Sequence, residues 1–204
     1  MTIGTQRVLR LALACLLPAL LCGCSVSRQA VVYYNLTPLT AAHPDHGPAD
    51  SGRPLALGVG PITLPESLSR AQIAVRLDAQ RLRYDDANRW SGSLAEDFAA
   101  VLLDDLATQL PAQASITLFP WGGWFQPSHR LVINVSRFDG ALNGEVVLKA
   151  RWTIANASGK ETMVARQSTI TVKVTAAGYP GLVAAQSQAV ADLATEIAAA
   201  LAAR

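Results

Sequence analysis

Val146-Val-Leu-Lys-Ala-Arg-Trp-Thr-Ile154 is the stretch of the chain that decides its fold. Its apolar residues stand at every second position: Val146, Leu148, Ala150, Trp152 and Ile154. Successive side chains of a β-strand point to opposite faces of a sheet, so this alternation predicts a strand with one buried face. Lys149 and Arg151 fall on the other face, which is typical of a partly solvated antiparallel sheet.

Two flanking segments repeat this pattern. The alternating apolar residues are Leu131, Ile133 and Val135 before the central segment, and Ile170, Val172 and Val174 after it. Asn143-Gly144 and Ser158-Gly159 supply turn residues to the two connections. The sequence therefore predicts three consecutive antiparallel strands. Their predicted solvent face carries Asn134, Ser136, Lys149, Arg151, Thr169 and Lys173.

Two helices are predicted beside these strands. Ser93-Leu94-Ala95-Glu96 is a capping box, in which hydroxyl and carboxylate each satisfy a free backbone N–H at a helix start. The helix that it opens ends before Pro111. A second, alanine-rich helix is predicted from about Gly181 to Ala203. It packs either on the sheet of its own chain, which we expect, or against another subunit.

The first third of the mature chain contains shorter elements. Residues 31–36 are β-rich, and residues 41–53 have the composition of a loop. Leu55 to Pro61 predicts a buried strand that Pro61 and Pro65 end, and residues 72–77 and 81–84 predict a hairpin. The predicted fold class is α/β: a mixed, partly antiparallel sheet flanked by helices, in a single domain over residues 31–204.

The N-terminus resembles a bacterial lipoprotein signal. Arg7 and Arg10 form a positive leader, and the apolar run that follows is too short to span a bilayer comfortably. Leu21-Cys22-Gly23-Cys24 then resembles a lipobox, with Cys22 where Ala or Ser is usual. We expect a signal peptide over residues 1–23, acylation of Cys24 and a lipidated tether over residues 24–30. The alternative is an ordinary secretory signal with an incidental cysteine.

Charge and cysteine content restrict the function. The chain has 17 basic and 15 acidic residues, and Arg7 and Arg10 of the leader account for the surplus. A balanced mature chain has no global field to recruit nucleic acid, so no nucleic-acid partner is expected. Cys15 and Cys22 belong to the leader and Cys24 carries the lipid, which leaves no thiol for a disulfide, a nucleophile or a zinc ligand.

The residue after Cys24 bears on location. In lipoproteins of Gram-negative bacteria, Asp at this position tends to retain the protein at the inner membrane, whereas this chain has Ser25. By that resemblance we predict the inner leaflet of the outer membrane, with the body in the periplasm. A tether from Ser25 to Ala30 reaches about 20 Å at roughly 3.3–3.6 Å per extended residue. The domain is therefore expected to stay close to the membrane.

The residues reveal no catalytic or metal-binding constellation. His43-Pro44-Asp45-His46 reads as a solvated loop, because a metal site needs three or four convergent ligands. Ser128-His129 lacks the hydrolase turn G-x-S-x-G, and Gly58-Val59-Gly60 lacks the third glycine of a dinucleotide site. The adjacent pairs Asp85-Asp86 and Asp104-Asp105 are interpreted as solvated faces. No metal and no cofactor are predicted.

Two segments are candidates for contact with a partner or a membrane. Phe119 to Phe125 concentrates aromatic residues in a turn-rich segment; Trp121, Trp124 and Phe125 suit a protein hot spot or a membrane interface, or else close the domain's own core. Pro61 and Pro65, with Arg70, would hold an extended ledge, which is either a binding edge or a rigid connection.

Several short motifs occur together in a fixed order. They are Tyr33-Tyr34-Asn35-Leu36 after the lipobox, Gly58-Val-Gly-Pro-Ile-Thr-Leu-Pro65 with Leu68 and Arg70, Trp90 before a helix, Arg137-Phe138, Ala150-Arg151-Trp152 and Ala184-Ala185-Gln186-Ser187. In this combination the chain resembles the PqiC (YmbA) lipoproteins, the auxiliary lipoprotein components of ABC-type and MCE-domain intermembrane transport systems. The resemblance covers nearly all of the mature chain, except the loops at 41–53 and 121–129.

The resemblance implies a non-catalytic outer-membrane subunit that contributes to envelope integrity. Its partner would be a periplasmic MCE-domain protein whose tunnel carries lipids between the two membranes, and a homo-oligomer stays open. It implies an α/β fold similar to the N-terminal domain of TolB. Among functional residues, only Cys24 is carried over from the family. Two alternatives stand beside this hypothesis: a lipid-binding shuttle module with its own apolar cavity, and a periplasmic enzyme of unknown type.

Overall fold

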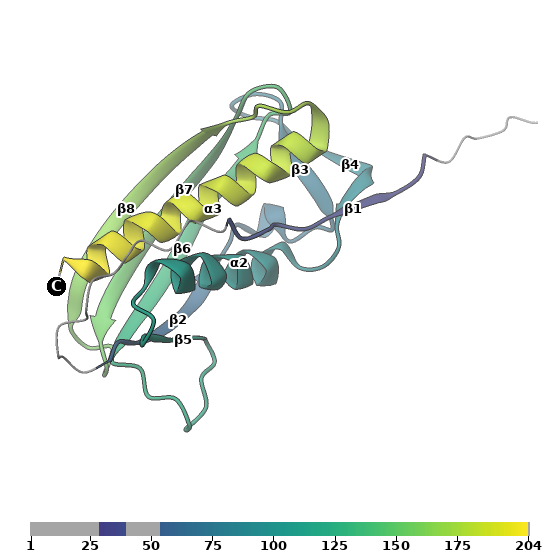
Figure 1. The fold of residues 1–204 in the computed structure, drawn as a ribbon. Coiled ribbons are helices and arrows are strands. Elements are labelled where there is room, and N and C mark those ends of the chain that lie inside the picture. The colour runs from purple at the N-terminus through teal and green to yellow at the C-terminus, as the bar shows by residue number, and fades with distance from the viewer. Residues whose placement is uncertain (1–28, 40–53, 204) are drawn as a thin grey trace, which may run out of the picture. The chain divides into compact units, whose positions relative to one another are not determined.

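Three long antiparallel strands form the centre of the structure, as the alternating segments predict. The computed structural model describes residues 29–39 and 54–203, and residues 31–204 make up one domain. Strands β6 (His129–Gly140), β7 (Glu145–Asn156) and β8 (Thr162–Lys173) pair in sequence order (Figure 1). The residues predicted for their solvent face are all exposed, and the apolar residues of β6 and β7 quoted above are buried on the other face.

Five shorter strands complete a mixed sheet of eight strands in the described part of the chain. Strand β1 (Val32–Tyr34) is parallel to β4 (Leu82–Trp90), which is antiparallel to β3 (Gln72–Arg76). Strand β2 (Ala56–Thr63) is parallel to both β6 and β5 (Ser115–Leu118). The sheet order is β1-β4-β3-β6-β2-β5, and β7 and β8 continue from β6. The predicted α/β class with a mixed sheet is confirmed.

The second strand does not end at Pro61, contrary to the prediction. Strand β2 continues to Thr63, and its pairing with β6 shifts register between Val59 and Ile62. Because the ladder is interrupted there, the missing N–H of Pro61 removes no regular inter-strand hydrogen bond. The ledge predicted after it contains a 3-10 helix, η1 (Glu66–Leu68).

Strand β5 and the second half of β4 were not predicted. β5 has four residues, which is too short to display a hydrophobic period. β4 continues through Asp85, Asp86 and Asn88, residue types that strands disfavour. It holds together because β1 and β3 pair on its two sides, and because Asp85 accepts hydrogen bonds from the Ala87 N–H and the Tyr179 hydroxyl.

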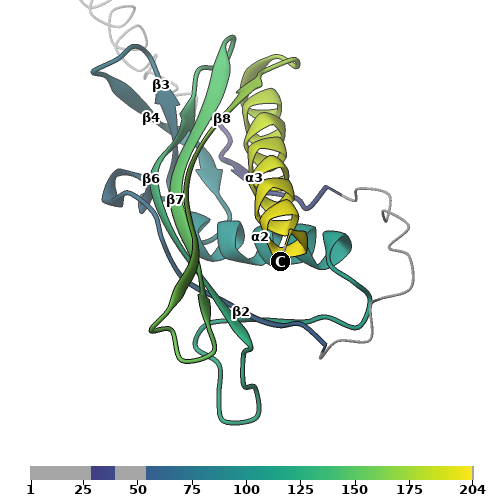
Figure 2. The same cartoon turned by 90° about the vertical axis from the view of Figure 1, so that its left-hand side faces the viewer.

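Two helices, α2 (Leu94–Gln109) and α3 (Gly178–Ala202), cover the same face of the sheet (Figure 2). The Ser93 side chain accepts a hydrogen bond from the Glu96 N–H, which confirms the predicted helix start. Helix α3 packs on β6, β7 and β8 and against α2, so the alanine-rich helix docks on its own sheet, as expected. Between the layers, Phe98 of α2 meets Phe138 of β6 edge-to-face at 5.2 Å between ring centroids.

A strap of four residues, Leu36–Leu39, lies against helices α2 and α3 after β1. Its backbone has no strand partner, and side chains of the helices accept its N–H groups instead. Leu36 N donates to Asp97 Oδ2 at 2.6 Å, Thr37 N to Ser187 Oγ at 3.1 Å, and Leu39 N to Asp105 Oδ1 at 2.8 Å. These bonds satisfy backbone donors that would otherwise lose water without replacement.

Asp105 is buried rather than solvated, which corrects the interpretation from the sequence. Its exposed fraction is 1 %, and its Oδ2 atom has no hydrogen-bond partner among the described residues. Burial raises the pKa of the Asp105 carboxyl to about 6; the bond from Leu39 opposes this shift and the charge of Asp104 adds to it.

Asp105 is expected to make stability depend on pH. Between pH 3.8 and about 6 the folded protein keeps a proton that the unfolded chain has released, so the free energy of unfolding falls as pH rises through this window. The loss is about 2 to 3 kcal/mol. Asp105→Asn keeps the acceptor for Leu39 and removes the charge. The free energy of unfolding of this variant, measured with urea at pH 4 and pH 7, should therefore lack the decrease that Asp105 causes in the wild type.

The matched control is Asp104→Asn, since Asp104 is exposed and adjacent in sequence. This variant should keep most of the pH dependence of the wild type, because burial is the largest cause of the raised pKa of Asp105 and the charge of Asp104 is a smaller one. If Asp105→Asn and the wild type lose the same stability between pH 4 and pH 7, Asp105 is not the group responsible.

Candidate partner-binding site

The aromatic loop, defined as residues 119–128, joins β5 to β6 at the end of the sheet where β6 begins (Figure 1). Trp124 and Phe119 are exposed by 79 % and 54 %, whereas Phe125 is buried. The loop therefore presents two large apolar side chains to solvent and holds a third against the domain. Large aromatic side chains exposed on one short loop are candidates for contact with a partner.

The loop is fixed to β2 at two points. Ser128 Oγ accepts from Ala56 N at 3.0 Å and lies 3.1 Å from the Ala56 carbonyl oxygen, and Ser128 N donates to the same oxygen at 2.8 Å. Trp121 lies on Gly58 of β2: a Cβ at this glycine would be 2.9 Å from the indole ring. Glycine at position 58 thus permits the close approach of the tryptophan to the strand.

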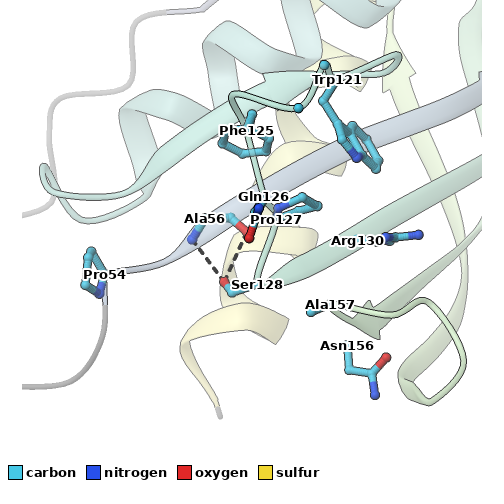
Figure 3. Close-up of a pocket in the computed structure, with 12 residues that line it drawn as sticks. Pro54, Ala56, Trp121, Phe125, Gln126, Pro127, Ser128, Arg130, Asn156 and Ala157 are labelled. Carbon is cyan, nitrogen blue, oxygen red and sulfur yellow. Dashed lines mark hydrogen bonds between the residues drawn. The ribbon is translucent and has the colours of Figure 1, made fainter.

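A groove of about 1020 Å³ lies between this loop, the start of β2 and the β7–β8 turn (Figure 3). Its walls combine apolar and polar side chains, and Arg130 is the one charged residue among those described as lining it. The lining residues are Pro54, Ala56, Trp121, Gly122, Gly123, Phe125, Gln126, Pro127, Ser128, Arg130, Asn156 and Ala157.

Arg130 is held in this groove by its position in the sheet. It pairs with Gly58 of β2 on one side and Ala155 of β7 on the other. Its Cζ atom is 5.8 Å from the ring centroid of Trp121, within reach of a cation–π interaction. Gly159, whose φ is +72°, closes the other side, where a Cβ would lie 3.2 Å from the guanidinium.

The predicted contact residues fall into separate places. Trp121 and Phe125 line the groove together. Pro61 lies with Phe119 in a smaller hollow of about 330 Å³ against Glu96 of α2. Pro65 precedes η1, and Arg70 lies 4.8 Å from the ring centroid of Tyr84, whose hydroxyl donates to the Ser67 carbonyl at 3.0 Å.

Other motif residues are divided between packing and exposure. Tyr34 donates its hydroxyl to Asn88 at 3.0 Å, and Trp90 is buried, so both hold β1 and β4 in the fold. Tyr33 is exposed by 62 %. Cys24 and the segment His43–His46 lie outside the residues that the structure describes.

Ser128 and His129 are hydrogen-bonded, with Oγ 3.0 Å from Nδ1. The serine hydroxyl also bonds the backbone of Ala56, so it serves to fasten the loop. Over residues 29–39 and 54–203, no group of three or more His, Cys, Asp and Glu side chains is arranged to hold a metal ion.

The sequence matches the family described as the ABC-type transport auxiliary lipoprotein component over residues 34–198. The chain belongs to this family. The resemblance to PqiC (YmbA) lipoproteins is thereby confirmed, and the chain is assigned to the auxiliary lipoproteins of ABC-type transport. No curated protein matches the sequence.

Two solved structures share the fold of this family member. A crystal structure of an uncharacterized protein is 20 % identical, with a TM-score of 0.68; the match covers 84 % of this chain and 99 % of the other. Protein XCC0632 from Xanthomonas campestris is 16 % identical, with a TM-score of 0.60; its match covers 83 % of this chain and 91 % of the other. At these identities the likeness concerns the fold.

Neither helix described for this auxiliary lipoprotein component is long and apolar enough to cross a bilayer.

Arg130 and Gly58 were missed as groove residues in the sequence analysis. Both residues belong to segments predicted as strands, but no local sequence pattern predicts that residues 58 and 130 lie side by side. The alternation of side chains along β6 could have placed Arg130 on the solvent face of the sheet, because it lies two residues before Val132 and four before Asn134.

Proposed function

We propose that this chain is an outer-membrane lipoprotein that serves as a non-catalytic subunit of an MCE/ABC-type system for intermembrane lipid transport. The family match over residues 34–198 is the observation that carries the proposal. In this proposal residues 1–23 are removed, Cys24 is acylated, and residues 24–30 tether a periplasmic domain to the inner leaflet of the outer membrane.

The geometry of the domain supports an adaptor role. The chain enters the sheet at β1, where Val32 pairs with Asn88 of β4. The next strand, β3, pairs with β4 on one side and on the other side with β6 at Gly140, the last residue of β6. The aromatic loop joins β6 at the opposite end, before His129. Twelve residues at about 3.3 Å each separate the two ends of β6 by roughly 35 Å. A domain tethered through β1 can thus present the aromatic loop away from its attachment.

The packed interior does not favour the lipid-shuttle alternative. The large side chains between sheet and helices, including Phe98, Phe138 and Trp152, are fully buried. In the described part of the chain, a hollow of about 240 Å³ lies between α3 and the sheet near His129 and Leu201. Pockets for small-molecule ligands are usually about 300–1,000 Å³, so this one is small for a lipid.

Site-specific photo-crosslinking in cells tests the adaptor proposal. A photo-reactive residue at position 124 is expected to capture an MCE-domain protein, because Trp124 is the most exposed aromatic of the loop among the described residues. The matched control is position 169 on β8, an exposed residue on the solvent face of the sheet, which should capture less. If neither position 124 nor general crosslinking of the full protein ever captures an MCE-domain protein, the proposed partner is wrong.

A further inference from the structure

Arg130 has no acidic partner in the part of the molecule that the structure describes. The four ion pairs found there use Arg76, Arg81, Arg89 and Arg137. The lining of the groove includes no Asp or Glu from the described residues. The Nε atom of Arg130 is buried and without a hydrogen-bond partner among them. A buried hydrogen-bond donor without a partner costs free energy, above all when it belongs to a charged group. A hydrogen-bond acceptor that binds the Arg130 guanidinium would therefore stabilise it.

The orientation of the guanidinium suits recognition of an anion. Trp121 on one side and the turn at Gly159 on the other restrict its movement. An arginine fixed in this way loses little side-chain entropy when its planar fork binds a carboxylate through two parallel hydrogen bonds. The charge of the groove therefore complements one negatively charged group.

The surroundings of Arg130 indicate what accompanies that group. Trp121, Phe125 and Pro127 supply apolar surface within the groove, and Trp124 is exposed beside it. Tryptophan and arginine are the residue types most enriched among the energetic centres of protein–protein interfaces. An acidic side chain with apolar neighbours in a polypeptide satisfies both halves of this surface.

The position of the groove favours a polypeptide over the anchoring membrane. It lies where β6 begins, whereas β1, through which the chain enters the sheet, lies near the level of the other end of β6. A short tether that leads into β1 would hold that other end nearest to the membrane. The groove would then face away from the lipid headgroups of the same leaflet.

We propose that this groove binds a segment of a partner polypeptide through one acidic side chain, which Arg130 holds while apolar neighbours of that side chain pack on Trp121. That the partner is the MCE-domain protein rests on the proposed function. The groove is then the surface through which the auxiliary lipoprotein engages the transport complex.

Binding of the full acylated chain, in detergent, to the purified periplasmic MCE-domain protein of the same transport system tests this proposal. Arg130→Gln is expected to weaken binding about 10- to 100-fold, because it leaves the partner's carboxylate unpaired. Arg130→Lys should recover only part of the loss, since lysine lacks the fork. Arg151→Gln is the matched control: Arg151 is exposed on the same sheet face, bonds Gln167 at 3.3 Å and does not line the groove, so binding should be unchanged.

Charge exchange identifies the contact. Arg130→Glu should abolish binding, and replacing one Asp or Glu of the partner by Arg should restore it. If wild type binds and Arg130→Gln binds equally well, or no partner substitution restores Arg130→Glu, this inference is overturned while the proposed function stands. If wild type fails to bind the MCE-domain protein, the proposed function fails.

A blocked tripeptide keeps the groove testable in that case. Acetyl-Phe-Glu-Phe-amide should shift the Trp121 indole resonance of the full chain, and acetyl-Phe-Gln-Phe-amide should do so only at concentrations at least about tenfold higher. Equal or absent shifts would overturn the proposed chemistry. An Arg130-dependent shift caused by short-chain phosphatidylglycerol but not by the Glu peptide would make a lipid headgroup the occupant and would also overturn it.

Discussion

Replacing Cys24 by alanine is expected to release the protein from the membrane while the domain of residues 31–204 remains folded. Acyl chains contribute about 0.8 kcal/mol of membrane affinity for each buried methylene, so if Cys24 is their attachment point, as proposed, its removal takes away nearly all of the anchoring free energy. Neither helix among the described residues is long and apolar enough to cross a bilayer. The domain is expected to keep its core contacts, because the buried core residues among those described lie between Leu36 and Ala200.

The measurement is the partition of the protein between membrane and soluble fractions, followed by thermal unfolding of the soluble variant. More than about nine-tenths of Cys24→Ala should be soluble, with a melting temperature within a few degrees of the wild type. Complementation of a deletion strain should fail. Full complementation by the soluble variant would show that anchoring is dispensable and would remove the basis of the tether argument.

Cys22→Ala is the matched control. Cys22 stands two residues before Cys24, at a position where lipobox sequences usually have Ala or Ser. This variant should be acylated and should stay with the membrane. If instead Cys22→Ala is released and Cys24→Ala retained, the lipidated cysteine has been assigned wrongly.

Replacing Trp152 by alanine is expected to produce the largest loss of stability among single substitutions in the sheet. Trp152 lies on β7 with an exposed fraction of 1 %, under helix α3. Its indole N–H donates to Ser168 Oγ at 2.9 Å, and Ser168 in turn bonds Glu196 of α3. The substitution leaves a large cavity and removes the indole donor to Ser168, a loss of about 3 to 5 kcal/mol.

Thermal and urea unfolding measure this loss. In a domain of this size 1 kcal/mol corresponds to about 2–4 °C, so the melting temperature should fall by at least roughly 6 °C. Trp152→Phe should lose less, because it keeps most of the ring volume. Trp124→Ala is the exposed counterpart and should change the free energy of unfolding by less than about 0.5 kcal/mol. Equal losses at positions 124 and 152 would contradict the burial seen in the structure.

The sheet was predictable from the sequence where its strands alternate. The segments around Leu131, Trp152 and Ile170 announce β6, β7 and β8 because one face of each is buried and the other is solvated. The cap at Ser93 and the final helix were predictable for the same reason, since helix starts and periodic stripes are local properties of the chain.

Other parts of the fold were beyond such reasoning. Strand β5 is too short for a period, and the second half of β4 has a composition that disfavours strands. Asp105 looks like any exposed carboxylate of a helix until the strap at Leu39 covers it. In each case, pairing or coverage by a distant segment overrides the local preference.

The candidate site divides in the same way. The sequence showed the aromatic segment with Trp121, Trp124 and Phe125. It left two alternatives open: an exposed contact surface, or a segment buried against the domain's own core. The structure shows that the segment does both, with Trp124 exposed and Phe125 buried. Arg130, the charged residue of the groove, was not predicted.

By itself, the sequence determined the secondary structure of the main strands and helices, the α/β class and the family, because these follow from local periodicity and from motifs in a fixed order. Only the tertiary structure decided that Trp121 and Arg130 line one groove, with Gly159 beside the guanidinium. The physical reason is register. The groove exists because the pairing of β2 with β6 and of β6 with β7 places residues 58, 130 and 155 side by side, and strand register depends on the packing of the whole sheet rather than on any short stretch of the chain.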